Sequence, residues 1–188
     1  MGGFRTTIDF GSREVDVEQL SASATLGWQR SARWGLVASL GAILDGSVDS
    51  GTKRDVGPGV IGSVSVTWLP LFESERGPFL LASLTLGGAT TTAVSDDGQA
   101  HRWSAFDLRA GLLLGKTFAE RFVPFVTARG FGGPVFWRLG GETVTGTDVH
   151  HYAVGAGFTF RVPGALDLFA ELLPLGEQSA SVGAVLAF

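Results

Sequence analysis

The sequence predicts an all-β fold: a closed antiparallel β-barrel of about ten strands that crosses a membrane as an up-and-down meander. Three observations predict it. Apolar residues recur at every second position along most of the chain, and the faces they form carry no charge. Only 17% of the 188 residues are charged while 45% are hydrophobic, against about 25% charged in a typical soluble domain. Residues 1–188 are expected to form one transmembrane β-barrel domain, with eight strands as the alternative if the first two are misjudged.

The alternation begins in residues 4–10, where Phe4, Thr6, Ile8 and Phe10 interleave with Arg5, Thr7 and Asp9. Successive side chains of a strand point to opposite faces, so this pattern predicts Arg5 and Asp9 inside the barrel and the apolar set outside. The same period then recurs in residues 20–28, 34–44, 60–68, 80–86, 106–114, 122–128, 152–160, 166–172 and 180–188.

The polar face of these segments predicts which side meets lipid. It consists mainly of Gly, Ser and Thr, small residues that suit a crowded interior, whereas a soluble barrel would carry many Lys and Glu there. In hydrocarbon every backbone group must be paired, which a closed barrel achieves. The pattern therefore favours a barrel in lipid over the alternative, a soluble sandwich or lipocalin-like barrel.

The connections predict the orientation. Outer-membrane barrels have short periplasmic turns and longer external loops, which places both termini in the periplasm. Short joints fall near 29–33, 70–77, 116–121 and 162–165, and longer ones near 11–19, 46–57, 93–101 and 138–148, with a short exception near 174–178. Aromatic residues near strand ends are expected to form interfacial belts: Trp28, Trp34, Trp68, Phe122, Phe160 and Phe188 at the periplasmic rim, and Phe10, Trp103, Phe136 and Tyr152 at the outer one.

Composition excludes several classes of function. The chain has no cysteine, so it has neither disulfides nor thiolate metal sites, and its net charge of −4 with no basic stripe argues against a nucleic-acid partner. Its three histidines do not form a set of metal ligands. No cofactor is expected. The residues after Met1 enter a strand pattern directly, and we expect that a signal peptide has been removed ahead of them.

The last strand carries a motif. Ser181, Gly183, Leu186 and Phe188 resemble the C-terminal assembly signal of bacterial outer-membrane proteins: a polar residue, a glycine, and apolar residues third from last and last. The chain as a whole is similar to small outer-membrane β-barrel domains. The resemblance implies location in the outer membrane of a Gram-negative bacterium and insertion by the barrel-assembly machinery. The lipid bilayer and lipopolysaccharide are then its surroundings, and a protein partner is left open.

Eight charged residues are predicted to face the lumen. Their mixed signs favour a salt-bridged plug, because a buried unpaired charge is costly; the alternative is the ion-selective lining of a porin-like pore for small solutes. Bulky inward residues such as Phe79 and Phe125 also favour a plugged or very narrow lumen. The predicted lumen charges are Arg5, Asp9, Asp107, Arg109, Arg129, Arg161, Asp167 and Glu171.

One pair of residues suggests chemistry. Asp148 and His150 resemble the Asp-x-His of omptin proteases at the extracellular rim, and Asp96-Asp97 distantly resemble the paired carboxylates of that family. The chain is much shorter than that family, and no His-x-Ser of a lipid A deacylase is present. We expect a non-enzymatic outer-membrane protein with a structural or interaction role, a small-solute pore being the first alternative and a rim-located hydrolase the second.

Overall fold

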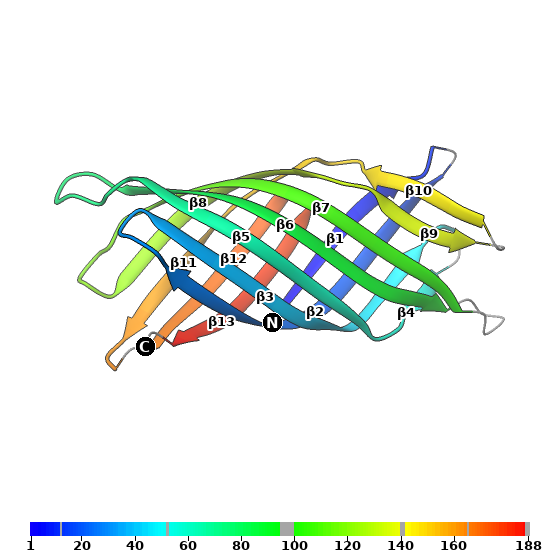
Figure 1. The fold of residues 1–188 in the computed structure, drawn as a ribbon, viewed down its shortest axis with the longest axis horizontal. Coiled ribbons are helices and arrows are strands. Elements are labelled where there is room, and N and C mark those ends of the chain that lie inside the picture. The colour runs from blue at the N-terminus through cyan, green and yellow to red at the C-terminus, as the bar shows by residue number, and fades with distance from the viewer. Residues whose placement is uncertain (12, 52, 95–99, 140–141, 165, 187–188) are drawn as a thin grey trace.

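The computed structural model describes residues 1–188 except 12, 52, 95–99, 140–141, 165 and 187–188. The described part forms a single sheet of thirteen strands, and every pairing within it is antiparallel (Figure 1). No helix in it has the length and hydrophobicity of a membrane span. The strands are β1 (Gly2–Asp9), β2 (Glu14–Gln29), β3 (Trp34–Asp49), β4 (Lys53–Val56), β5 (Gly59–Leu71), β6 (Phe79–Val94), β7 (Ala100–Gly115), β8 (Phe122–Gly132), β9 (Val135–Leu139), β10 (Glu142–Asp148), β11 (Tyr152–Val162), β12 (Leu166–Gly176) and β13 (Gln178–Leu186).

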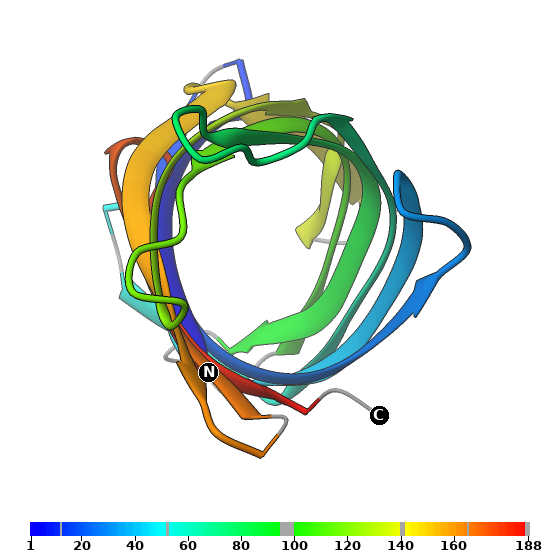
Figure 2. The same ribbon diagram turned by 90° about the vertical axis from the view of Figure 1, so that its left-hand side faces the viewer.

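The strands close into a ring, as the view along its length shows (Figure 2). Strand β1 closes it, because β1 pairs with β2 along one edge and with β13 and then β10 along the other. The other strands follow one another around the ring in chain order, as an up-and-down meander does. The fold is therefore all-β and antiparallel, as the alternation predicts.

The predicted count of about ten strands is wrong, because three short strands, β4, β9 and β10, form outside the predicted strand segments and lie in line with β5, β8 and β11. β4 and β5 both pair with β3 and with β6, so they lie in line. β8 and β9 share β7 as a neighbour in the same way, and β10 and β11 extend along β9 and β8. Gly57-Pro58 and Gly133-Pro134 separate the first two pairs. Proline has no amide hydrogen to donate to a ladder, so each Gly-Pro step breaks its strand.

The hairpin of β12 and β13 changes the width of the ring. It turns at Gly176 (φ 80°) and Glu177, whose backbone N–H donates to the carbonyl of Tyr152 at 2.9 Å. Beyond this turn β10 pairs directly with β1, Ile8 lying opposite Asp148. We call the end with the 30–33 and 116–121 turns the wide end and the opposite one the narrow end. The wall contains β12 and β13 at mid-height and lacks both at the narrow end.

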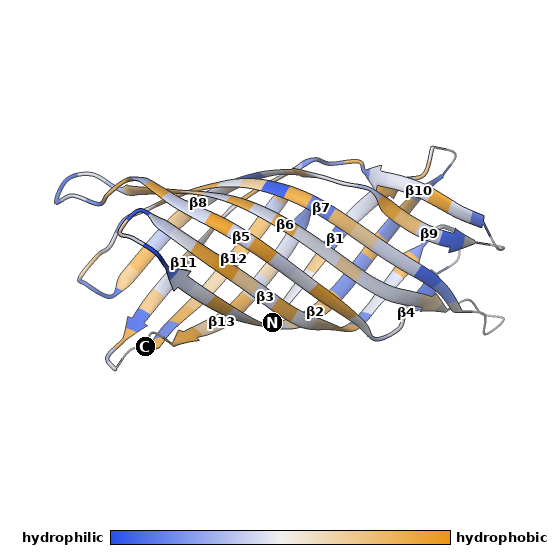
Figure 3. Cartoon of the chain, in the orientation of Figure 1, coloured by the Kyte–Doolittle hydropathy of each residue, from blue (hydrophilic) through white to orange (hydrophobic). Residues whose placement is uncertain are grey.

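The two faces of the wall exchange polarity along the axis. Toward the wide end the outer face is apolar: Leu84, Leu86 and Leu112 are 52%, 63% and 54% exposed. Toward the narrow end the apolar side chains are buried inside the ring. Hydrophilic residues appear there near β4, β9 and β10 (Figure 3). The buried cluster there consists of Ile8, Val15, Val17, Ile43, Val48, Val56, Trp103, Val135 and Trp137.

Because of this exchange, the inward and outward faces of β1 are the reverse of those predicted. Thr6 and Ile8 are buried inside the ring, while Arg5 and Asp9 are exposed on its outer surface. Arg5 pairs there with Asp16 at 3.5 Å and Glu18 at 3.6 Å. Alternation at every second residue predicts a strand but does not say which of its two faces points inward. The prediction of Arg5 and Asp9 as lumen charges chose the wrong face and was wrong.

Two turns at the wide end are tied together. The backbone N–H and hydroxyl of Thr117 each donate to the Glu73 carboxylate at 2.7 Å, and Lys116 Nζ lies 3.6 Å from it. The hydrogen bond from the Thr117 side chain is the largest cause that lowers the pKa of Glu73. These contacts join the β5–β6 and β7–β8 turns, which are adjacent because β6 pairs with β7 along its whole length.

The hairpin turn gives the first prediction. A Cβ added at Gly176 would lie 1.9 Å from the carbonyl oxygen of Tyr152, and its φ is positive. We expect Gly176→Ala to lower the free energy of unfolding by about 3 kcal/mol, combining left-handed strain with overpacking. Gly164, with φ 101° and nothing within 4 Å, is the matched control, and Gly164→Ala should cost only about 1 kcal/mol. Urea unfolding in detergent, followed by tryptophan fluorescence, measures both; equal losses would contradict the close packing at the turn.

Candidate functional site

The strongest concentration of buried charge lies inside the ring at mid-height. Neighbouring strands β7 and β8 contribute Asp107, Arg109 and Arg129, and the β12–β13 hairpin contributes Glu171 and Glu177. We call these five residues the charged layer. The alternation of β7, β8 and β12 directs these strand residues inward, and the tight turn at Gly176 directs Glu177 into the interior.

Arg109 is the centre of the charged layer. Its Nη1 and Nη2 donate to Glu177 Oε1 and Oε2 at 2.8 and 3.2 Å, a bidentate arrangement. Its Nε donates to Asp107, and its guanidinium carbon lies 4.6 Å from the centre of the Phe131 ring. One planar cation therefore contacts two carboxylates, one on its own strand and one on the β12–β13 turn, while stacking on an aromatic face.

Glu177 is the buried member of this group. Its side chain is 6% exposed, whereas those of Asp107 and Arg109 are 24% and 31% exposed. The adjacent apolar cluster of Phe131, Ala153 and Leu173 limits water around it. A buried carboxylate without a partner is costly, so Glu177 requires Arg109.

Arg129 and Glu171 form a second ion pair. Arg129 Nη2 lies 2.6 and 2.5 Å from the two carboxylate oxygens of Glu171. Their side chains are 31% and 12% exposed. This pair joins β8 to β12 across the intervening β11, which carries Gly157 opposite both Glu171 and Phe125. A Cβ at Gly157 would lie 2.5 Å from the Phe125 ring, so the glycine leaves room for that ring beside the ion pair.

The structure thus brings together four of the eight predicted lumen charges and adds one that the prediction missed. Asp107, Arg109, Arg129 and Glu171 belong to the charged layer, with Glu177 as the additional member. Arg161 and Asp167 lie opposite each other in the β11–β12 ladder near the wide end, apart from the layer. The sequence signal for Glu177 was the unusually short connection near 174–178, which indicates a turn that stops before the narrow end.

The aromatic residues separate into two groups. Trp28, Trp34, Trp68, Phe122, Phe160 and Tyr152 are all exposed, by 40–57%, and Trp34 stacks on Trp68 at 5.8 Å. Trp103 is 6% exposed and packs inside against Trp137 and Phe10. The prediction of Trp103 and Phe10 as outer belt residues was wrong, because the inner face of the ring is apolar at the narrow end.

The suggested catalytic pair is not assembled. Asp148 accepts a hydrogen bond from the Thr6 hydroxyl at 3.0 Å, whereas His150 is exposed and its ring lies 6.1 Å from that of Tyr152. No hydrogen bond joins Asp148 to His150, both of which are described. Asp96, Asp97 and Phe188 lie outside the described residues; Ser181, Gly183 and Leu186 lie on β13. The described residues contain no group of three or more acidic or histidine side chains arranged to hold a metal.

Comparisons with known proteins give only distant likenesses. No family profile matches the chain, and no curated protein matches it. Among solved structures, the Pseudomonas putida toluene transporter TodX has a TM-score of 0.33 at 15% identity, over 94% of this chain and 62% of that one. Outer membrane phospholipase A from Escherichia coli has a TM-score of 0.28 at 10% identity, over 99% of this chain and 95% of that one.

The Salmonella typhi outer membrane phospholipase dimer gives the same TM-score and identity as the Escherichia coli enzyme, with 99% of this chain and 89% of that one covered. This chain spans less than two thirds of the TodX chain. All three TM-scores are too low to assign a family or an activity. Any functional conclusion therefore depends on the chain's own geometry.

The charged layer generates the second prediction. Arg109→Met would leave Asp107 and Glu177 without their shared cation, and we expect a loss of about 3–5 kcal/mol in unfolding free energy. Arg5, whose side chain is 57% exposed and pairs with Asp16 and Glu18 on the outer surface, provides the control. Arg5→Met should cost less than about 1 kcal/mol. Urea titration in the same detergent compares them, and losses of similar size would show that the charged layer does not depend on Arg109.

Proposed function

We propose that this chain is an integral outer-membrane β-barrel without enzymatic activity, whose lumen is closed and whose role is structural or interactive. The observation that carries the proposal is the exchange of polarity between the two faces of the wall. The exposed apolar outer face toward the wide end suits acyl chains, whereas the narrow end combines a charged exterior with an apolar core, as a water-exposed part would.

Two layers of side chains inside the ring support the proposal of a closed lumen. At the narrow end Trp103, Trp137 and Phe10 pack with ring centres 5.4–5.9 Å apart. Below them the charged layer lies in the lumen on the side of β7, β8 and the β12–β13 hairpin, where two arginines form ion pairs with three carboxylates. An ion-selective pore needs accessible charges that a passing ion can reach, and the paired charges favour the plug over the porin-like alternative.

The absence of a hydrogen bond between Asp148 and His150 supports a non-enzymatic role over the omptin-like one. A general base must lie within hydrogen-bond reach of its partners. The proposed orientation places the wide end, toward which β13 runs, in the periplasm and the narrow end outside, toward lipopolysaccharide. The barrel-assembly machinery, acting on the last strand, is the proposed route of insertion.

The membrane-facing surface gives the third prediction. Leu84 lies on the outer face opposite Ala110 of β7, in the middle of the apolar region. We expect Leu84→Arg to reduce the free energy of folding into lipid vesicles by about 2–4 kcal/mol, as for a charge at the bilayer midplane. Phe118→Arg, in the 116–121 turn where Phe118 is 53% exposed, should cost about 0–1 kcal/mol. Folding into vesicles, read by protease protection, compares them, and equal folding would contradict the placement in lipid.

The closed lumen gives the fourth prediction. We expect the protein in planar lipid bilayers to show no discrete conductance steps, because the aromatic cluster and the charged layer block the lumen. Insertion is verified in parallel by protease protection in vesicles of the same lipids. Regular single-channel steps from inserted protein would reject the plug and favour the small-solute pore.

A further inference from the structure

The outer surface of the wide end carries a hollow beside the turn that joins β2 to β3. Its volume is about 800 Å³, and its lining includes Trp28, Trp34, Leu36 and Val66 together with Arg30 of the turn. Trp28 lies opposite Leu36, and Leu36 opposite Val66, so the apolar part of the lining spans three adjacent strands. We call this feature the rim hollow.

The turn holds the lining of the rim hollow in place. The Ser31 hydroxyl oxygen accepts hydrogen bonds from the backbone N–H groups of Arg33 and Trp34 at 3.3 and 3.1 Å. The backbone N–H of Arg30 donates to the carbonyl of Trp34 at 3.0 Å. On its other side the Trp34 ring stacks on Trp68, with an angle of 17° between the ring planes. Arg30 is therefore kept beside the tryptophans by a defined turn.

The rim hollow is polar at the turn and apolar along the strands. Arg30 lies at the wide end, whereas Leu36 and Val66, 41% and 40% exposed, lie farther along the strands toward mid-height. The next outward row toward mid-height consists of Leu26, Ala38 and Val64. This order from charged to apolar is the order along a lipid molecule, whose headgroup lies at the interface and whose acyl chain lies in the hydrocarbon.

The cations at the rim hollow have no acidic neighbour on its own elements. Residues 19–44 and 56–72 include the whole lining and contain neither Asp nor Glu, and their only charged residues are Arg30 and Arg33. None of the ion pairs among the described residues includes either arginine. Glu73, the next acid along the chain, already accepts hydrogen bonds in the neighbouring turn. The local positive charge therefore favours a negatively charged ligand.

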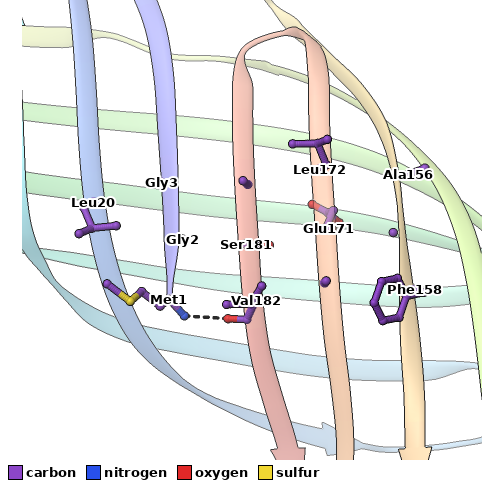
Figure 4. A pocket seen from close by; sticks show the side chains of 13 residues that line it. Met1, Gly2, Gly3, Leu20, Ala156, Phe158, Glu171, Leu172, Ser181 and Val182 are labelled. Carbon is purple, nitrogen blue, oxygen red and sulfur yellow. Dashed lines mark hydrogen bonds between the residues drawn. The ribbon is translucent and has the colours of Figure 1, made fainter.

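A second hollow on the molecule lacks this combination. It has a volume of about 410 Å³ and is lined mainly by β1, β11, β12 and β13 (Figure 4). No arginine or lysine side chain of the described residues lines it, and its one carboxylate, that of Glu171, is paired with Arg129. A negatively charged ligand is therefore expected in the rim hollow and not in this one.

We propose that the rim hollow binds one phospholipid of net negative charge, with its phosphate at Arg30 and Arg33 and an acyl chain over Leu36 and Val66. A planar guanidinium donates paired hydrogen bonds to phosphate oxygens. Tryptophan rings are favoured at the level of the headgroups, and basic pockets on membrane proteins bind anionic headgroups. The proposal rests on the membrane placement proposed above and adds a lipid of defined charge at one place on the rim.

The test measures quenching of tryptophan fluorescence in detergent micelles, so that it does not depend on insertion into a bilayer. The probe is phosphatidylglycerol with brominated acyl chains, which quench a tryptophan that they contact, and phosphatidylcholine with the same chains is the reference. Trp103 and Trp137, 6% and 1% exposed inside the ring, are shielded from both lipids. We expect half of the quenching at a mole fraction of phosphatidylglycerol about tenfold below that of phosphatidylcholine. Equal mole fractions would overturn the proposal and leave the membrane placement untouched.

A matched pair of variants separates binding in the rim hollow from a general effect of surface charge. Arg30→Gln/Arg33→Gln removes both of its cations, and we expect the two lipids to quench this variant at equal mole fractions. Arg121→Gln/Arg161→Gln removes two exposed cations at the same end, where the backbone N–H of Arg161 donates to the carbonyl of Arg121. This control should keep the tenfold preference. A preference that survives in the first variant, or that both variants lose, would overturn the proposal.

A displaced reporter tests whether the preference is local. Trp28→Phe/Trp34→Phe/Trp68→Phe/Phe160→Trp moves the outward tryptophan to β11, where Phe160 is 41% exposed. We expect phosphatidylglycerol and phosphatidylcholine to quench this reporter at equal mole fractions, because it lies outside the rim hollow. A tenfold preference at this position as well would show that the negatively charged lipid gathers around the whole ring, and it would overturn the proposal.

Discussion

Closure of the hydrogen-bond ladder through β1 is the constraint on which the rest of the structure depends. A sheet in an apolar medium cannot leave an edge unpaired, and β1 is the strand that joins the first part of the ring to the last. Its eight residues pair with β2 throughout, with β13 at one end and with β10 at the other. Because β13 ends its pairing with β1 at Gln178, β10 must take over, and the hairpin β12–β13 must stop short of the narrow end.

The narrowing explains where apolar and polar side chains go. A ring of fewer strands has a smaller interior, just wide enough for side chains to fill. Large apolar residues such as Trp137 and Ile43 fill it at the narrow end, each 1% exposed. At the level where β12 and β13 join the wall the interior is wider, and the inward positions carry Ser, Thr, Gly and the charged layer, together with aromatic rings such as Phe125 and Phe169. On the outer face the order is reversed, with apolar residues toward the wide end and charged residues toward the narrow end. The exchange of polarity and the narrowing of the ring therefore have one geometrical cause.

The sequence predicts the parts of this arrangement that depend on local pattern. Period-two alternation predicts the long strands correctly because it follows directly from strand geometry. It cannot say which face is inside, and Arg5 was assigned to the wrong side for that reason. Trp103 was assigned to the aromatic belt because it lies near a strand end, although it shares a face with Asp107 and Arg109. Gly57-Pro58 and Gly133-Pro134 were visible in the sequence, but whether a Gly-Pro step ends a strand or merely interrupts it depends on the neighbouring strands.

The charged layer, too, was predicted from the sequence only in part. Arg109, Arg129 and Glu171 were found because each is a charged residue on the face opposite an uncharged apolar face. Glu177 was not, since a glutamate in a turn is usually solvated, and only the pairing of β10 with β1 beyond the hairpin places this turn inside the wall. Once Glu177 is enclosed, its charge requires a cation at the same height, and Arg109 on the inward side of β7 supplies one that also reaches Asp107. The length of one hairpin thus determines both the width of the ring and the ion pair inside it.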